Sequence, residues 1–228
     1  MRYAIEPPPV SSLPIEGSEA RFPVHRIYCI GRNYAEHAKE MGAEVVSRGN
    51  PVFFLKPSDA IALGDEVPYP SATRELHHEV EMVVALSSGG RDIAPARALE
   101  CVFGYGVGLD LTRRDLQAAA KTKGLPWDTA KAFDASAPVS PLRAASEVGH
   151  PTRARLSLRV NGELRQDTDI ADMIFPVADI LAELSKLFEL RAGDLIFTGT
   201  PSGVGPLVRG DAFAAELRGI ATLEGRIV

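Results

Sequence analysis

The feature that most limits the fold of this chain is a succession of short apolar runs, rich in β-branched and aromatic residues and separated by Gly and Pro. Runs of this length and composition are typical of buried strands. We expect strands over residues 26–31 (RIYCIG), 51–57 (PVFFLKP), 79–86 (EVEMVVAL), 104–112 (GYGVGLDLT) and 194–201 (DLIFTGTP). The Asn161-Gly162 pair between two alternating segments, in LSLRVNGELRQ, predicts a hairpin.

Helical patterns are fewer and shorter than the strand patterns. We predict helices over residues 33–41 with Asn33 as N-cap, over 95–103, over 113–124 ending near Gly124, and over 176–188 with Pro176 at the start. A strand-rich order with scattered helices favours an α+β fold over regular β-α-β alternation. The first 21 residues carry four prolines and little periodicity. We therefore expect an extended arm over residues 1–21, followed by a single domain over residues 22–228.

Composition excludes several classes of function. The chain has 228 residues and a formal net charge of -5, which does not suit nucleic-acid binding, where a basic stripe is expected. No stretch approaches the roughly 18 apolar residues of a membrane-spanning helix, and the N-terminus lacks the apolar core of a signal peptide. Cys29 and Cys101 lie far apart in apolar runs, so we expect buried thiols in a reducing cytoplasm.

Three acidic residues are candidates for a metal site. Glu79 and Glu81 are two apart in an expected strand, so both side chains lie on one face. Two like charges side by side in a core strand are costly unless a cation cancels them; the alternative is an edge strand with two solvated glutamates. Asp110 ends an uncharged stretch and is either a helix N-cap or a third ligand. Three carboxylates suit a hard ion such as Mg²⁺.

The neighbouring His77 and His78 are interpreted as structural residues, because no Cys or HExxH motif accompanies them to indicate zinc.

A second polar group lies on the expected helix over residues 33–41. His37 and Glu40 are three apart and share a face. A carboxylate beside an imidazole orients it and raises its basicity, so the pair could activate a water. The alternative is a surface helix with scattered charges.

Other patterns mainly exclude chemistry. The loop TGTPSGVG over residues 198–205 lacks the GK[ST] ending of a phosphate-binding loop, and the glycines at 104, 106 and 108 fail the GxGxxG template. We therefore expect no nucleotide cofactor. The loop could still bind a carboxylate through hydroxyl and backbone N–H groups, or be a plain turn. Without a GxSxG motif or a Cys in a nucleophile context, a covalent acyl-enzyme is disfavoured.

Six blocks in order give the chain a family resemblance: GRNYAEHAKEM, PVFFLKPSDAI, HHEVEM, GYGVGLDLTRRDLQ, KGLPWDTAKAFDASAPV and GDLIFTGTPSGVGP. Together they resemble the fumarylacetoacetate hydrolase family over residues 26–228, and its acylpyruvase and fumarylpyruvate hydrolase branch in particular. The resemblance implies a β-rich, mixed β-sheet roll with peripheral helices, usually dimeric, with a Mg²⁺ or Mn²⁺ site.

The resemblance also implies roles for particular residues. It makes Glu79, Glu81 and Asp110 the metal ligands, His37 and Glu40 the water-activating pair, and Lys131 a group that stabilises developing oxyanion charge. The substrate contacts that it implies are Arg114, Gln117, Thr200 and Lys56. His37 and Glu40 would lie on a lid over residues 33–50, with Gly42 and Gly49 as hinges.

These roles predict a metal-dependent hydrolase acting on C–C bonds in ketonic substances, with a small 2,4-diketo acid as substrate and a homodimer as assembly. We favour fumarylpyruvate, a product of aromatic catabolism that gives fumarate and pyruvate. Its second carboxylate would need a further cation, for which Arg32, Arg113 and Arg114 are the candidates. The alternatives are a general acylpyruvase, an oxaloacetate decarboxylase, an isomerase of an unsaturated hydroxy-diacid, and a metal-stabilised scaffold without catalysis.

Overall fold

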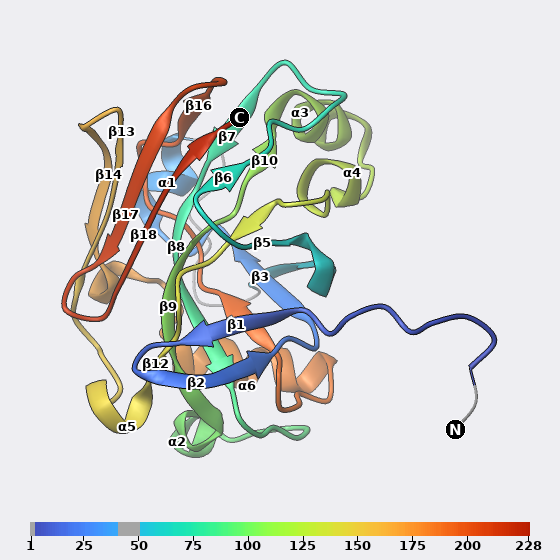
Figure 1. The fold of residues 1–228 in the computed structure, drawn as a ribbon. Coiled ribbons are helices and arrows are strands. Elements are labelled where there is room, and N and C mark those ends of the chain that lie inside the picture. Colours follow the sequence, from blue (N-terminus) through green and yellow to red (C-terminus); the bar gives the residue numbers. More distant parts are fainter. Residues whose placement is uncertain (1–2, 41–50) are drawn as a thin grey trace.

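A six-stranded mixed sheet runs through the centre of the computed structural model, which describes residues 3–40 and 51–228 (Figure 1). Neighbouring strands are antiparallel except for the parallel pair β15 and β3. In sheet order the strands are β12 (Arg143–Ala144), β9 (Val102–Leu109), β8 (Val80–Leu86), β15 (Leu195–Phe197), β3 (Ile27–Gly31) and β4 (Val52–Lys56). The expected runs thus form one mixed sheet.

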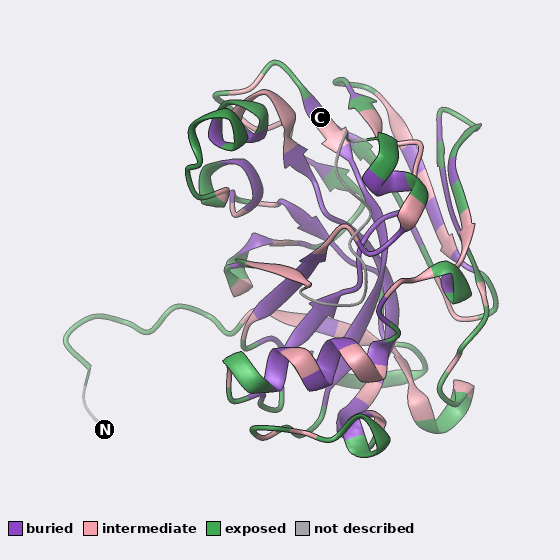
Figure 2. Ribbon diagram, turned by 180° about the vertical axis from the view of Figure 1, so that it is seen from behind, coloured by how far each residue is buried: buried purple, intermediate pink, exposed green. Residues whose placement is uncertain are grey.

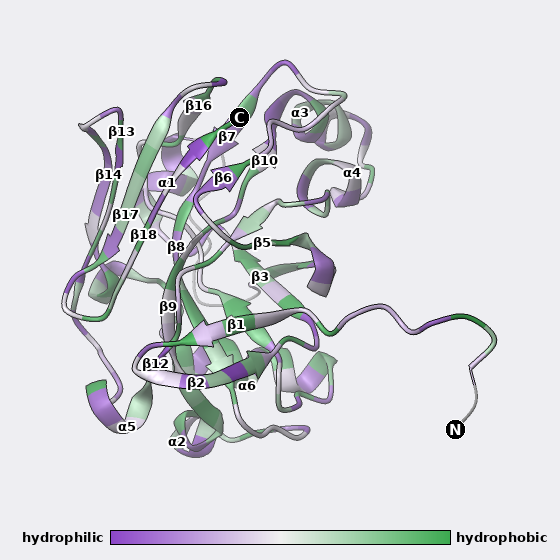
Figure 3. Ribbon diagram, viewed as in Figure 1, coloured by the Kyte–Doolittle hydropathy of each residue, from purple (hydrophilic) through white to green (hydrophobic). Residues whose placement is uncertain are grey.

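A five-stranded sheet packs against the β8–β9 pair, and the two sheets share one hydrophobic core. Its strands are, in order, β14 (Glu163–Asp169), β13 (Arg155–Val160), β17 (Ala212–Leu217), β18 (Ala221–Ile227) and β6 (Glu66–Val67). The predicted hairpin joins β13 to β14, with positive φ at both Asn161 and Gly162. The edge strand β14 is mostly hydrophilic (Figure 3).

Smaller β elements complete the roll. A three-stranded sheet comprises β10 (Thr112–Arg113), β7 (Leu76–His78) and β16 (Gly205–Leu207), and β11 (Ala137–Pro138) pairs with β5 (Ile61–Ala62). The helices lie around the strands, as predicted (Figures 1 and 2). They are α1 (Ala35–Glu40), α2 (Pro95–Ala98), α3 (Arg114–Lys123), α4 (Asp128–Lys131), α5 (Ala145–Val148) and α6 (Val177–Leu187), with 3₁₀ turns at Ser58–Ala60, Leu99–Cys101 and Ile170–Asp172. No described helix is long and apolar enough to cross a membrane.

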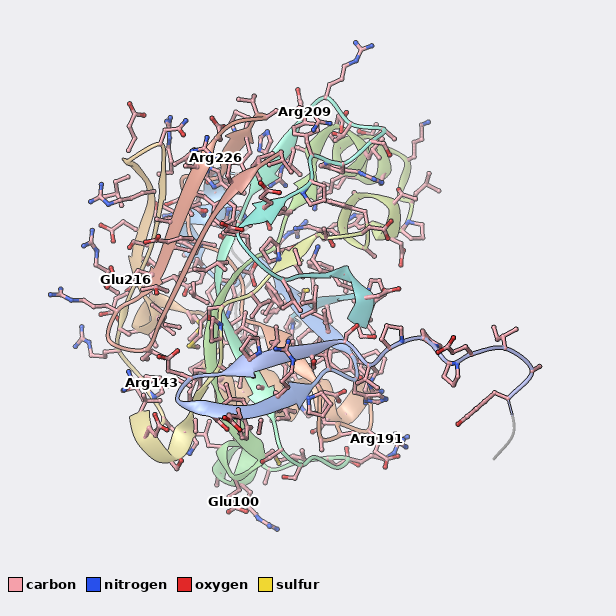
Figure 4. The ribbon with its side chains drawn as sticks, viewed as in Figure 1. Glu100, Arg143, Arg191, Arg209, Glu216 and Arg226 are labelled. Atoms are coloured by element: carbon pink, nitrogen blue, oxygen red, sulfur yellow. The ribbon has the colours of Figure 1, made fainter. Side chains whose placement is uncertain are left out.

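The two faces of β8 enter two different cores. Val80, Met82 and Val84 contribute to the core shared with the five-stranded sheet. Val83 and Ala85 contribute to a second core, on the other face. Because side chains alternate along a strand, Glu81 lies on the same face of β8 as Val83. It stands at the end of the strand, where the apolar part of that face stops. Charged side chains such as Glu100, Arg143 and Arg191 instead lie at the periphery (Figure 4).

The N-terminal segment differs in part from the extended arm that the sequence predicted. Residues 3–10 are exposed and run away from the body of the molecule (Figure 1). The next residues form a hairpin of β1 (Ser12–Ile15) and β2 (Ser18–Pro23). Its Leu13 and Phe22 are buried in the second core, and the N–H of Leu142 donates to the carbonyl of Pro14. Burial of these two side chains accounts for the order that local periodicity did not reveal.

Asn33 is not the N-cap of α1, which begins two residues later. Its buried amide donates to the carbonyls of Phe175 (3.0 Å) and Thr198 (2.7 Å) and accepts from the N–H of Phe175 (2.7 Å). A buried amide needs partners of its own, and the fold supplies them from residues distant in sequence. Helix α3, in contrast, ends at Gly124 in the left-handed conformation, as predicted. Residues 41–50 of the predicted lid, with its two hinge glycines, lie outside the described residues.

Candidate active site

Three carboxylates gather where β8 and β9 lie side by side. Glu79 directly precedes β8, Glu81 lies in it opposite Gly108, and Asp110 directly follows β9. The N–H of Asp110 donates to the carbonyl of Glu79 (2.8 Å), which continues the ladder. One oxygen of each carboxylate lies within 4.8 Å of the others, and all three residues are buried. A solvated edge strand is therefore wrong, as is Asp110 as N-cap, because α3 begins at Arg114.

Three cations lie against this acidic cluster. The ammonium of Lys131 is 2.7 Å from an oxygen of Glu79 and 2.5 Å from one of Asp110. Arg114 donates a hydrogen bond to the other oxygen of Glu79. The Nζ of Lys56 lies 2.9 Å from Oδ1 of Asp110, but its hydrogen bonds go to the carbonyls of Leu111 and Lys131. The sequence-predicted Lys56 and Lys131 thus belong to the cluster, both fully enclosed.

The two glutamates titrate in opposite directions. Burial opposes ionisation of Glu79, but the charges of Lys131 and Arg114 outweigh it and hold the pKa of this carboxyl well below its usual range. Burial, and then the negative charges of Asp110 and Glu79, raise the pKa of Glu81 well above its usual range. The nearby charges of Asp110 and Glu79 likewise raise the pKa of Lys131, although burial opposes this. Glu81 is therefore the carboxylate with the least compensating positive charge.

The carboxylate oxygens of this cluster fit a divalent cation. All three groups are carboxylates, which suit hard ions such as Mg²⁺ and Mn²⁺. Oδ1 of Asp110 is buried and accepts no hydrogen bond from the described residues. Glu81 lies beside two other carboxylates, whose negative charges oppose its ionisation. A divalent ion would satisfy both. Within residues 3–40 and 51–228, this potential metal-binding group contains no His or Cys; His78 instead contacts the amide of Gln166 (2.9 Å).

The loop over residues 198–205 does bind carboxylates, but those of the protein itself. The N–H of Gly199 donates to Oε2 of Glu81 (2.7 Å), and the N–H of Gly203 donates to both oxygens of Glu40 (3.1 and 3.2 Å). Both glycines have φ near +90°, and an added Cβ would come within 2.6 Å of Asn33 or 2.1 Å of the Arg165 carbonyl. The loop therefore links the acidic cluster to helix α1, and only glycine fits at these two points.

The hydroxyl of Thr200 is also occupied. It donates to the carbonyl of Val80 (2.9 Å) and accepts from the amide of Gln166 (2.8 Å). The amide oxygen of Gln166 in turn accepts from the N–H of Val80 (3.0 Å). Gln166 is therefore a buried residue that holds the loop against β8, and sequence reasoning missed it. An amide in a hairpin strand of otherwise ordinary polarity gives no local signal of such a role.

His37 and Glu40 lie together beside the acidic cluster. The imidazole is buried, and its Nδ1 is 3.6 Å from Oε2 of Glu40, which is too long for a hydrogen bond. Burial lowers the pKa of His37 below its ordinary 6.5, although the charge of Glu79 and the contact with Glu40 oppose this. A neutral imidazole is a competent proton acceptor. The alternative of a plain surface helix is wrong for His37.

One cavity brings these groups together with the residues of α3. Arg114 and Gln117 both line it, and Nη1 of Arg114 donates to the amide oxygen of Gln117 (2.5 Å). Its other sequence-predicted lining residues are His37, Glu79, Glu81, Asp110, Lys131, Thr200 and Arg32. Arg113 is not among the lining residues, because it stacks on Phe133 (4.5 Å) and donates to the carbonyl of Thr129. Glu40 and Lys56 do not line the cavity but contact residues that do, Glu40 beside His37 and Lys56 beside Asp110.

Five further lining residues were not singled out from the sequence: Ile30, Gly31, Phe54, Lys121 and Trp127. The spacing from Arg114 to Gln117 and Lys121 is three and then four residues, which places all three on one helix face. That periodicity could have identified Lys121.

Comparison with known proteins agrees with the family resemblance of the sequence. Residues 26–228 match the family described as fumarylacetoacetate (FAA) hydrolase C-terminal. A solved structure of fumarylpyruvate hydrolase from Pseudomonas aeruginosa in complex with Mn²⁺ and pyruvate is 49% identical, with a TM-score of 0.97, and the match covers 100% of this chain and 99% of that one. This protein therefore belongs to the fumarylacetoacetate hydrolase family, an enzyme family.

Other relatives carry a different activity in their names. The mitochondrial oxaloacetate tautomerase FAHD1 of Mus musculus is 46% identical over 88% of this chain and 90% of its own length. The oxaloacetate tautomerase YcgM of Escherichia coli is 44% identical over 90% of this chain and 93% of its own length.

Glu81→Gln tests the acidic cluster as a metal site. Without metal, we expect this variant to melt at the same or a higher temperature than the wild type, because it replaces a buried carboxyl group whose ionised form is poorly compensated. With Mn²⁺ at about 100 times its Kd, the wild type should gain about 2 to 3 kcal/mol, and the variant little. Thermal melts in chelator and in Mn²⁺ measure both effects.

The matched control is Glu224→Gln, the same change at an exposed strand position. It should keep the full Mn²⁺ effect. Equal stabilisation of Glu81→Gln and wild type by Mn²⁺ would show that Glu81 does not bind the ion.

Proposed function

We propose that this protein is a divalent-metal-dependent hydrolase that cleaves the C–C bond of an acylpyruvate, with fumarylpyruvate as its substrate. The observation that carries this proposal is one cavity lined by three buried carboxylates, the imidazole of His37 and the ammonium of Lys131. The close similarity to a fumarylpyruvate hydrolase that binds Mn²⁺ and pyruvate supports it.

We propose Glu79, Glu81 and Asp110 as the ligands of Mg²⁺ or Mn²⁺. When bound, the ion would polarise the keto acid as a Lewis acid and hold it in place. Binding at Glu79 and Asp110 would also compete with the contacts that Lys131 makes to both carboxylates. That competition would free the Lys131 ammonium to face a substrate oxygen.

Residues of α3 and of the 198–205 loop would orient the substrate. Gln117 accepts from Arg114 through its amide oxygen, so its NH₂ group is the end available to donate to a substrate. The hydroxyl proton of Thr200 is used by Val80. The N–H groups of Gly199 and Gly203 are likewise used by Glu81 and Glu40, so a substrate carboxylate beside this loop would need another backbone N–H of the loop.

The hydrolytic step would begin at His37. Its neutral imidazole takes a proton from water as the oxygen attacks the acyl carbonyl carbon, with Glu40 beside the resulting imidazolium. The tetrahedral adduct then breaks its bond to the neighbouring CH₂ carbon, which leaves with the electron pair as the enolate of pyruvate. Lys131 stabilises the negative charge that develops. Return of the proton to carbon gives pyruvate, and the acyl part leaves as fumarate.

Oxaloacetate tautomerisation is the second candidate, because the relatives from Mus musculus and Escherichia coli carry that name. It moves a proton between carbon and oxygen of a keto acid and requires no attack by water. His37 would then exchange a proton with carbon directly. Oxaloacetate decarboxylation and isomerisation of an unsaturated hydroxy-diacid share the enolate chemistry. A homodimer and a cytoplasmic location stay predictions.

A substrate comparison with the wild-type enzyme and Mg²⁺ tests the proposed function. We expect kcat/KM for fumarylpyruvate to exceed that for acetylpyruvate by about tenfold or more, since a cation left unpaired by the shorter tail costs binding. Loss of diketone absorbance measures both. A ratio near one would indicate a general acylpyruvase, and faster turnover of oxaloacetate would contradict the proposal.

His37→Ala separates the proton acceptor from the metal site. We expect hydrolysis to fall by about 100-fold or more while Mn²⁺ affinity stays the same; Glu36→Gln, on the exposed side of α1, is the control. In the wild type, kcat/KM should be constant above pH 6.5 and fall at lower pH, because burial lowers the pKa of His37 and protonation inactivates it. Loss of Mn²⁺ binding in His37→Ala would instead assign His37 to the metal site.

A further inference from the structure

An aromatic path leads from the acidic cluster to the mouth of the cavity. The ammonium of Lys131 lies 5.0 Å from the ring centre of Phe54, and the rings of Phe54 and Trp127 are 6.0 Å apart. The Nζ of Lys121 lies 5.3 Å from the ring of Trp127. All four residues line the same cavity, so two aromatic rings separate an inner ammonium from an outer one. We call Phe54 and Trp127 the aromatic wall.

Three elements bring the outer end of this path together. Lys121 lies in the last turn of α3, Trp127 directly precedes α4, and Phe54 lies in β4. Helix α4 packs against both α3 and β4, and α3 and α4 lie side by side (Figure 1). The position of Lys121 relative to the wall is therefore fixed by the packing of regular elements.

The charges along the path are unequal. At its inner end, Lys131, Lys56 and Arg114 equal the three carboxylates in number, and their ion pairs go to Glu79 and Asp110. At its outer end, neither Lys121 nor Arg32 forms an ion pair with any residue in the described ranges 3–40 and 51–228. Partial burial, and then the positive charge of Arg114, lower the pKa of the Lys121 ammonium. An anion at the mouth would be stabilised there.

We infer that Lys121 is the specificity-determining residue for the far carboxylate of a long dicarboxylic substrate, whose planar unsaturated tail lies along Phe54 and Trp127. The inference rests on the proposed function, in which the keto acid end is held at the acidic cluster. A planar conjugated tail presents a flat face to the aromatic rings, and its terminal carboxylate meets an ammonium that is already stacked on Trp127. The methyl end of acetylpyruvate offers Lys121 no charge, and the distal carboxylate of oxaloacetate sits on a shorter chain.

This assignment replaces the three candidates that the sequence suggested. Arg113 does not line the cavity, and Arg114 is engaged by Glu79 and Gln117 at its inner end. Arg32 lines the cavity and has a left-handed backbone, with φ of 61°, but it has no described contact with the aromatic wall. Lys121 is therefore the cation that the packing places at the end of the path.

The test compares substrates in Lys121→Gln. We expect kcat/KM for fumarylpyruvate to fall by about 10- to 100-fold, mainly through KM, because the lost partner is a charged group of the substrate. The values for acetylpyruvate and oxaloacetate should change by less than about threefold. Lys121→Arg should restore most of the fumarylpyruvate value. Lys123→Gln, an exposed lysine on the same helix, is the matched control and should change none of them.

The outcomes distinguish this inference from the proposed function. An equal fall for fumarylpyruvate and acetylpyruvate would place Lys121 at the common keto acid end and overturn the inference. A wild-type preference for fumarylpyruvate that survives in Lys121→Gln would overturn the inference alone. A wild type without that preference would contradict the proposed function, and the inference with it.

Discussion

Three carboxylates share one buried space at the ends of β8 and β9, and the electrostatic cost of that arrangement governs the surrounding structure. Lys131, Lys56 and Arg114 lie against the cluster and balance its formal charge. The balance is uneven, because among the described residues Glu81 receives only the N–H of Gly199 as a close hydrogen-bond donor, and burial with its acidic neighbours raises its pKa. A divalent cation would correct this imbalance, which is the physical reason to place one there.

The same loop that holds Glu81 also holds the helix that carries the candidate base. Gly199 binds Glu81, Gly203 binds Glu40, and Asn33 binds the carbonyl of Thr198. The positions of the His37 imidazole and of the Glu81 carboxylate thus depend on one short segment. Any movement of this loop would act on both groups at once, so the loop hydrogen bonds couple Glu81 to the helix that carries His37.

Local periodicity predicted the parts of the site that depend on local geometry. Glu79 and Glu81 share a face because strand side chains alternate, and α3 ends at Gly124 because glycine accepts the left-handed conformation. Contacts between distant segments escaped prediction. The β1–β2 hairpin depends on burial of Leu13 in a core built mostly from other strands, and Asn33 bonds to residues more than 140 positions away rather than capping α1.

The claim that one divalent ion occupies the acidic cluster beside the substrate is tested most directly by Mn²⁺ electron paramagnetic resonance on the wild-type protein, with and without pyruvate. We predict one saturable Mn²⁺ per chain and a change in the spectrum of the bound ion when pyruvate is added, because the keto acid would then enter its surroundings. Absence of saturable binding, or a bound-ion spectrum that pyruvate leaves unchanged, would contradict the claim.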